Sequence, residues 1–456
     1  MNSATHSARS ALETWRSFSP AASRKLKERK VPHIIIVGGG VAGLILATRL
    51  GHALGHRNRA RISLIDRSWS HVWKPMLHTF AAGTWNIYQQ QVQYVAHARA
   101  HHFEYVPGQL EAVDHATARI RLAPLREDGE LVAGSRELDY DLLVLAFGSR
   151  ANEFATPGVL EHCYFIDNQG QAEAFNARLR AHIVRSLSQG GNIDIAIVGG
   201  GATGVELAAE LSRMVDLAAG YGAADIRRRL RLTVLESAPR ILTAFPEAIS
   251  TLAASELRLL GVDVCTRVRV VAADAAGYLL ESGQTVPADL KVWAAGIRAS
   301  ETFKDCGLQL NGAGQLMIGP NLLVKGEQSI FALGDCASLV PKGTERPLPP
   351  TAQVANQQAL HLARHLPGLL RQGRSLPEFH FHDFGALVSL SDYNAFGTLG
   401  RFGFFKGGFI KGRFAQLSHA LLYRRHQLSL HGPGRAALMW LADSINARVQ
   451  PSIRMS

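Results

Sequence analysis

Two glycine-rich turns carry the residue types that hold the pyrophosphate of a dinucleotide. Each turn has three glycines at G-x-G-x-x-G spacing, follows a short apolar strand and precedes an apolar helix. The first glycine permits the tight turn, the second lets backbone approach a pyrophosphate, and the third lets helix and strand pack closely. The helix then directs unpaired N–H groups and its positive dipole end at the phosphates. The predicted contacts are Gly38, Gly40, Gly43, Gly199, Gly201 and Gly204.

An acidic residue ends the strand that follows each turn. Asp66 closes the predicted strand 60–66, and Glu236 closes the predicted strand 231–236. A carboxylate there accepts hydrogen bonds from ribose hydroxyls and repels the extra 2′-phosphate of NADPH, which favours NADH at the second turn. Glu236 lies further from its turn than the usual ~20 residues, because the segment 221–229 indicates an insertion. The chain therefore contains two copies of one strand–turn–helix–strand module.

Further apolar strands end in small residues and glycine. The segment 141–149 follows the first module, and the segment 290–297, whose closing turn contains Gly296, follows the second at a comparable place. A later strand ends in Gly334-Asp335, where the carboxylate can bind the ribityl hydroxyls of a flavin. A proline-rich stretch then leads into a predicted helix with Thr351 as its N-cap.

These elements together resemble the glutathione-reductase-like superfamily of flavoproteins, which bind two dinucleotides. The resemblance rests on both glycine turns and on the segments AFGS, AAGI and ALGDCA. It implies an α/β fold with two Rossmann-like domains, in which the FAD domain is split by an inserted NADH domain. The expected organisation is a basic leader (1–31), an FAD-binding domain in two parts (32–190 and 319–392), an NADH-binding domain (191–318) and a C-terminal membrane-anchoring region (393–456).

One helix segment narrows the resemblance to a family. Ala352–Gln357 with Gln358 resembles the A-Q-x-A-x-Q signature of type II NADH:quinone oxidoreductases, the single-subunit, non-pumping respiratory dehydrogenases. Gln353 and Gln357 share one helix face and offer amide donors to quinone carbonyls. The alanines Ala352, Ala355 and Ala359 predict a stripe of small residues that a flat ring can approach, and the helix N-terminus can stabilise negative charge on a reduced flavin.

Two other segments resemble the same family. HVWKPMLH (71–78) is similar to its W-K-P-L-L-H segment beside the flavin, which makes Lys74 a candidate cofactor contact. Thr79 stands where the family often has an acid, so a role for such an acid does not carry over. The tail 421–455 also looks like that of proteobacterial members. Glu206 resembles the glutamate that the family places near nicotinamide and quinone, with a role in positioning or proton supply.

The resemblance implies hydride transfer from NADH to FAD and two-electron reduction of a membrane quinone, without proton pumping. Two alternatives stay open. Sulfide:quinone oxidoreductases use separated cysteines, so Cys163 and Cys336 are candidates for that chemistry as well as for buried apolar thiols. An NADH-binding flavoprotein that acts as a redox sensor or interaction protein, as apoptosis-inducing-factor-like proteins do, is the other.

The net charge of +12 is concentrated at the two ends of the chain. Residues 1–31 hold seven basic and two acidic side chains (+5), residues 395–456 hold nine and one (+8), and the remainder is therefore 12 − 5 − 8 = −1. Basic ends suit an anionic surface, either phospholipid or nucleic acid. No nucleic-acid recognition motif accompanies them, which favours phospholipid.

A C-terminal helix with one apolar face indicates how such a surface is met. Leu438, Leu441, Ile445 and Val449 share one helix face, which Arg435 and Arg448 flank, and the segment 401–414 interleaves aromatic and basic residues. No apolar run is long enough to span a bilayer, so an in-plane anchor is predicted. The expected location is the cytoplasmic face of the bacterial inner membrane, with the mitochondrial inner membrane as the alternative. The helix can instead dock on the core or form a homodimer face.

Cysteine and histidine spacing predicts no metal centre. The four cysteines form no C-x-x-C pair, and their small number favours a reducing compartment. The histidines His97, His101 and His102 predict a polar helix surface.

Overall fold

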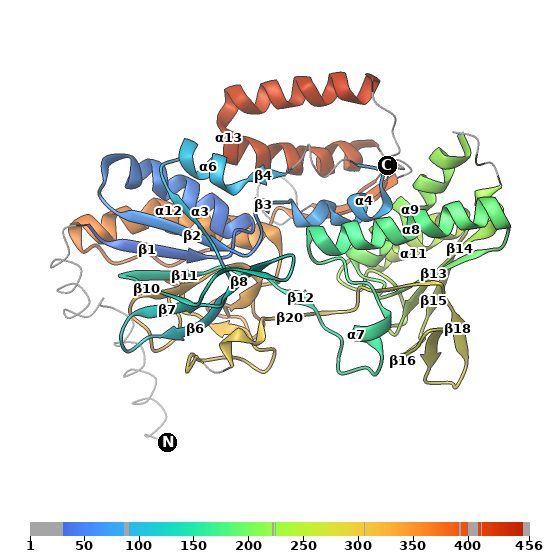
Figure 1. The fold of residues 1–456 in the computed structure, drawn as a ribbon, viewed down its shortest axis with the longest axis horizontal. Coiled ribbons are helices and arrows are strands. Elements are labelled where there is room, and N and C mark those ends of the chain that lie inside the picture. The colour runs from blue at the N-terminus through green and yellow to red at the C-terminus, as the bar shows by residue number, and fades with distance from the viewer. Residues whose placement is uncertain are drawn as a thin grey trace. The chain divides into compact units, whose positions relative to one another are not determined.

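The computed structural model describes residues 31–85, 91–220, 223, 225–304, 306–391, 394–399, 409–411 and 413–449. These residues form two compact units (Figure 1). Unit 1 holds the described residues of 31–71, 92–149 and 298–381, and unit 2 holds those of 72–91, 150–297 and 382–449. The basic leader and most of the segment 401–414 lie outside the described residues.

Unit 1 is organised by a five-stranded sheet in the order β22-β11-β1-β2-β5, whose pairings are all parallel. Every residue of β1 (His33–Val37) is buried, as expected for a strand covered on both faces. The glycine turn after β1 leads into α3 (Val41–Ala53), which packs against α12 (Ala352–Gln372). The other sheet strands are β2 (Arg61–Asp66), β5 (Glu104–Pro107), β11 (Leu142–Leu145) and β22 (Ile330–Ala332).

Shorter elements complete unit 1. The strands β10-β7-β6 form an antiparallel sheet, and β21 pairs with β23. The bounds of these elements are η1 (Gly55–Arg57), β3 (Ser70–His71), β4 (Val92–Gln93), α6 (Tyr94–Ala100), β6 (Leu110–Asp114), β7 (Arg119–Leu122), β8 (Leu125–Glu127), β9 (Glu130–Ala133), β10 (Arg136–Asp139), η3 (Glu301–Phe303), β21 (Leu316–Met317), η4 (Gly334–Cys336) and β23 (Ala337–Ser338).

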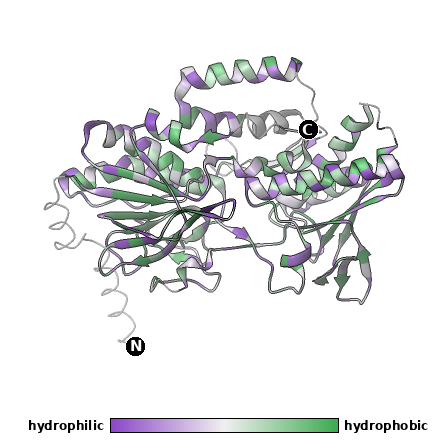
Figure 2. Ribbon diagram, viewed as in Figure 1, coloured by the Kyte–Doolittle hydropathy of each residue, from purple (hydrophilic) through white to green (hydrophobic). Residues whose placement is uncertain are grey.

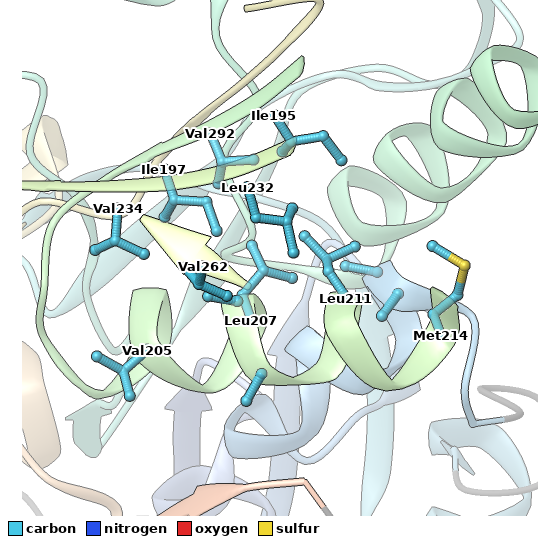
Figure 3. Packing of buried hydrophobic residues seen from close by; sticks show 14 of the residues in the cluster. Ile195, Ile197, Val205, Leu207, Leu211, Met214, Leu232, Val234, Val262 and Val292 are labelled. Carbon is cyan, nitrogen blue, oxygen red and sulfur yellow. The ribbon is translucent and has the colours of Figure 1, made fainter. Parts of the chain in front are cut away.

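Unit 2 repeats the arrangement with a four-stranded parallel sheet in the order β15-β14-β13-β19. Helix α9 (Ala202–Gly220) follows the second glycine turn. Its Leu207 and Leu211 belong to the same buried cluster as Ile197, Leu232 and Val292 of the sheet (Figure 3). Figure 2 shows that the strands of both parallel sheets are mostly hydrophobic, which fits their burial. The sheet strands are β13 (Ile193–Val198), β14 (Leu230–Glu236), β15 (Val262–Thr266) and β19 (Leu290–Trp293).

Two elements from distant parts of the sequence, α4 and β24, contact α9 within unit 2. Helices α4 (Leu77–Ala82) and α8 (Gln169–Gln189) pack against each other, and both α4 and strand β24 (Gly385–Leu390) contact α9. β24 belongs to an antiparallel sheet with β25 (Asn394–Leu399) and β26 (Phe409–Lys411). The remaining bounds are η2 (Lys74–Met76), β12 (Arg150–Ala151), α7 (Val159–His162), α10 (Ile226–Arg229), α11 (Glu247–Leu259), β16 (Val270–Ala273), β17 (Gly277–Leu280), β18 (Thr285–Pro287) and, at the unit boundary, β20 (Ile297–Arg298).

Helix α13 (Arg413–Val449) folds back on itself. Gly432 has φ 74° and ψ 173° and precedes Pro433, so the helix breaks there into an inner part, which packs on β24–β26, and an outer part (Figure 1). Trp440 donates through Nε1 to Gln427 Oε1 at 2.9 Å, and Arg424 pairs closely with Asp443. These contacts hold the outer part against the inner part.

The fold class predicted from the sequence is confirmed: two parallel α/β modules, each with a glycine turn after its central strand, form the body of the described chain. Among the described residues, no helix is both long and apolar enough to cross a bilayer. The functional bounds at 190, 318 and 392 stay predictions, since the two compact units group segments by packing.

Candidate functional site

The first glycine turn divides its glycines into two kinds. Gly38 has φ +104°, and a Cβ on it would lie 2.4 Å from the carbonyl oxygen of Ala146. A Cβ on Gly43 would lie 1.9 Å from the oxygen of Gly38. For Gly40, by contrast, no described atom lies within 4 Å of an added Cβ. Two glycines are therefore required by the fold, and the middle one faces open space.

The second turn has the same division. A Cβ on Gly199 would lie 2.6 Å from the oxygen of Ala294, and one on Gly204 would lie 2.0 Å from the oxygen of Gly199. Gly201 matches Gly40, with no described atom within 4 Å of the added Cβ. Both turns thus have the geometry in which a ligand can approach the backbone at the second glycine.

Asp66 binds back to the first turn. Its Oδ2 accepts the backbone N–H of Gly39 at 2.6 Å, and its Oδ1 accepts that of Ser68 at 2.8 Å. Burial raises the pKa of this carboxyl, and the two N–H donors oppose that rise. The carbonyl of Gly39 accepts the Tyr94 hydroxyl at 2.7 Å, so the turn is fixed from both sides.

Glu236 occupies the same place in unit 2, despite its longer spacing from the turn. Its Oε2 accepts the N–H of Gly200 at 2.6 Å, and its Oε1 accepts that of Ala238 at 2.7 Å. The loop after β14 also contains Arg240, whose guanidinium donates to the carbonyls of Leu242, Thr243 and Phe245 at 3.1, 3.1 and 2.9 Å. The Arg240 guanidinium therefore points into its own loop.

The Gly334-Asp335 turn in unit 1 is held by residues that sequence reasoning missed. Ser149 donates its hydroxyl to Asp335 Oδ2 at 2.8 Å. Gln358, which is 2% exposed, accepts the N–H of Gly334 through its side-chain oxygen at 2.7 Å. Gln358 sits next to Gln357 in the recognised signature, but spacing alone does not tell which glutamine faces inward.

Helix α12 begins as predicted. The Thr351 side chain caps it by accepting the N–H of Val354 at 3.3 Å, and Gln357 Nε2 lies 3.5 Å from Gln353 Oε1 on the same face. The predicted alanine stripe is wrong in part. Ala355 and Ala359 are buried, and the Ala355 methyl packs against Gly334, because this face closes the core of unit 1. Of the three alanines, Ala352 alone keeps partial exposure.

Lys74 and Gly296, the remaining predicted cofactor contacts, lie in unit 2. Lys74 Nζ forms a 3.1 Å ion pair with Asp167, whose other oxygen accepts the N–H of Ala151 at 2.6 Å. Gly296 has φ +61°, and a Cβ on it would lie 2.6 Å from the ring of Phe154. The positive φ thus favours glycine at 296. A cofactor role for either residue stays a prediction.

Glu206 is buried inside unit 2 at the start of α9. Its Oε1 accepts the backbone N–H of Ser389 at 3.0 Å, and its Oε2 lies 3.7 Å from His78 Nδ1. Burial raises its pKa to about 8, against the opposing hydrogen bond from Ser389. A carboxylic acid at this place is mostly protonated at neutral pH and can act as a proton donor.

The histidine prediction is wrong for two of its three residues. His97 and His101 are buried, and their rings pack 4.1 Å apart in a cluster that includes His52. Among the described residues, no group of histidine, cysteine, aspartate or glutamate could hold a metal ion. Cys336 is fully buried, and burial raises the pKa of its thiol to about 12.

Comparison with known proteins places these features in context. The model of the pyridine nucleotide-disulphide oxidoreductase family matches residues 32–359. A type II NADH:quinone oxidoreductase from Haemophilus influenzae is 35% identical over 445 residues, which cover 93% of this chain and 99% of the relative. The solved structure of NDH2 from Plasmodium falciparum in complex with NADH has a TM-score of 0.80 at 19% identity, covering 93% of this chain and 100% of that one. The sulfide:quinone oxidoreductase of Aquifex aeolicus has a TM-score of 0.69 at 17% identity, covering 93% and 96%. Both structures share the fold.

Proposed function

The chain belongs to the pyridine nucleotide-disulphide oxidoreductases and, among them, to the type II NADH:quinone oxidoreductases, and on that premise we propose how its residues carry out this activity. It is an FAD-dependent enzyme that transfers a hydride from NADH to FAD and two electrons on to a membrane quinone. The observation that carries the proposal is the pair of glycine turns. In each turn an acidic side chain accepts a backbone N–H, and the space beside the second glycine is open.

The first turn suits FAD. Open space beside Gly40 leaves room for a pyrophosphate, Asp66 lies at the ribose position, and Asp335 offers a carboxylate for ribityl hydroxyls. When bound, FAD accepts a hydride at N5 and passes two electrons to an acceptor. The protein positions the group and sets the charge around it, with Lys74 and the N-terminus of α12 at Ala352 as further contacts.

The second turn suits NADH rather than NADPH. Gly201 provides the open approach for the pyrophosphate, and Glu236 provides a negative charge where NADPH would carry its 2′-phosphate. Recognition of that phosphate needs a nearby cation, and Arg240 is engaged by three carbonyls of its own loop. The adjacent Gly296 then fixes the turn after β19.

We assign quinone binding to the first turns of α12 and, separately, proton supply to Glu206 at the start of α9. Gln353 and Gln357 offer amide donors to quinone carbonyls, and both are partly exposed. The overall reaction, NADH + quinone + H⁺ → NAD⁺ + quinol, consumes one proton. Glu206 supplies it, because its raised pKa keeps the carboxyl protonated at neutral pH.

The outer part of α13 serves as the membrane contact. Leu438, Leu441, Ile445 and Val449 are 53–76% exposed, and Arg435 and Arg448 are exposed beside them. Apolar groups in the acyl boundary with cations on the headgroups give a peripheral, in-plane attachment. We place the enzyme on the cytoplasmic face of the bacterial inner membrane. The same exposed face would serve a homodimer.

The sulfide:quinone alternative is disfavoured by Cys336. That chemistry needs a thiolate, and a fully buried thiol with a pKa near 12 is not ionised at neutral pH. The redox-sensor alternative predicts slow turnover with quinone, so rapid turnover of the purified protein with quinone would argue against it.

Separate measurement of the two half-reactions tests these assignments. In Glu206→Gln, flavin reduction by NADH should keep its rate, and reoxidation by a quinone should slow at least tenfold, because the variant lacks the proton donor. The exposed Glu247→Gln on α11 is the matched control and should change neither rate. Unchanged rates of both half-reactions in Glu206→Gln would remove the proposed role.

A further inference from the structure

Helix α9 carries a second buried acid one turn after Glu206. Glu210 is 2% exposed and Glu206 is 8% exposed. Residues four apart on a helix are neighbours, with Cβ atoms about 6 Å from each other. Two carboxyl groups therefore share one buried region of unit 2.

Different partners surround the two carboxyl groups. The Thr84 hydroxyl donates to Glu210 Oε1 in a short contact, and Arg213 Nη1 lies 3.3 Å from the same oxygen. A hydroxyl donor and a guanidinium are both favourable partners for a carboxylate. Glu206 accepts the backbone N–H of Ser389 and, among the described residues, has His78 Nδ1 at 3.7 Å. The structure thus offers more stabilisation of negative charge at Glu210 than at Glu206.

Close carboxyl groups do not ionise independently. A negative charge on one disfavours ionisation of the other, as in paired catalytic carboxylates. Burial is the largest cause of the raised pKa of Glu206, and the charge of Glu210 adds to it. The other groups facing Glu206 act in the opposite direction: the Ser389 N–H on β24 favours the carboxylate, and His78 on α4 would do so when protonated.

We propose that Glu210, paired with Thr84 and Arg213, is a positioning residue whose negative charge keeps the Glu206 carboxyl protonated between turnovers. This rests on the proposed role of Glu206 in quinone reduction. In each turnover one proton leaves Glu206 for a quinol oxygen, and solvent returns one proton to the carboxylate. Glu210 exchanges no proton in this cycle. Its negative charge favours the return of the proton to Glu206.

The pH dependence of quinone reduction tests the proposal. In the holoenzyme, the rate at which a soluble quinone reoxidises the flavin should decrease towards alkaline pH as Glu206 ionises. This decrease is the alkaline limb of the pH profile. Glu210→Gln should move that limb to lower pH by about one to two units, the size expected for two charges one helical turn apart in a protein interior. Thr84→Val, which keeps the shape of the side chain, should move the limb in the same direction by less.

Controls separate this inference from the proposed function. Glu247→Gln removes a negative charge from an exposed place and should leave the limb unmoved. An infrared titration of the holoenzyme, with the protonated-carboxyl band assigned by its loss in Glu206→Gln, should show the same shift in Glu210→Gln. If Glu206→Gln slows quinone reduction while neither Glu210→Gln nor Thr84→Val moves the limb, the tuning role of Glu210 is wrong. If Glu206→Gln has no effect, the proposed function of Glu206 fails instead.

Discussion

Gly201→Ala is expected to weaken NADH binding without disturbing the fold. No described atom lies within 4 Å of the Cβ that the substitution adds. Gly201 is also absent from the glycines with positive φ, so alanine fits its backbone without strain. The new methyl group therefore meets no protein atom, and it stands where the backbone would approach the pyrophosphate.

The magnitude follows from the cost of crowding a close contact. Inserting a methyl group into a packed site costs about 1–3 kcal/mol, which corresponds to an NADH dissociation constant about 5- to 150-fold larger. Protein stability should change by less than about 0.5 kcal/mol, as for a substitution without contacts. Gly204→Ala provides the contrast, because its Cβ would lie 2.0 Å from the oxygen of Gly199 and should destabilise the fold.

Anaerobic stopped-flow reduction of the flavin, measured against NADH concentration, gives the dissociation constant and the limiting rate. Thermal unfolding of the same preparations checks the fold. A Gly201→Ala protein that melts like the wild type and binds NADH within twofold of it would refute the assignment of the second turn. An equal loss in melting temperature for Gly201→Ala and Gly204→Ala would refute the division of roles among the glycines.

Three further predictions concern quinone reduction, membrane binding and stability at acid pH. Gln353→Ala removes one amide donor and should slow quinone reduction about 2- to 10-fold while sparing flavin reduction by NADH, so an equal loss in both half-reactions would count against the quinone assignment. Leu441→Glu with Ile445→Glu should reduce binding to anionic lipid vesicles at least 100-fold in a sedimentation assay, because two apolar side chains that would be buried in the acyl boundary are replaced by charged ones. Leu259→Glu, at an exposed leucine on α11, is the control and should bind normally. Burial lowers the pKa of six described histidines below 6.5 (His33, His52, His182, His361, His365 and His431), and they outnumber Asp66 and Glu206, whose raised pKa acts in the opposite direction. The unfolded chain therefore takes up more protons than the folded chain as the pH falls below about 6.5, and the melting temperature should decrease there; a flat profile from pH 7 to pH 5 would contradict this.

The glycine turns show what the sequence could predict. Gly38, Gly43, Gly199 and Gly204 are required by close backbone contacts, and such steric needs produce a fixed spacing that sequence displays. The Thr351 cap and the acids Asp66 and Glu236 were predictable for the same reason, since each acts on backbone a few residues away or at the end of the adjacent strand.

Contacts between distant segments were not predictable. Glu206 meets Ser389 across 183 positions, and Thr84 meets Glu210 across 126. The burial of His97 and His101 likewise depends on α3, which supplies Thr48 and His52 as partners. The burial of Ala355 depends on Gly334 of a preceding turn. Residue type and periodicity give no information on which distant segment covers a given face.

The most direct test of the central claim is an anaerobic titration of the purified, flavin-loaded protein. Two glycine turns that bind FAD and NADH, with a quinone as acceptor, predict bleaching of the flavin absorbance by stoichiometric NADH, much slower bleaching by NADPH and none by sulfide. Addition of a soluble quinone should then restore the oxidised spectrum. Bleaching by sulfide but not by NADH, or failure of quinone to restore the spectrum, would contradict the account.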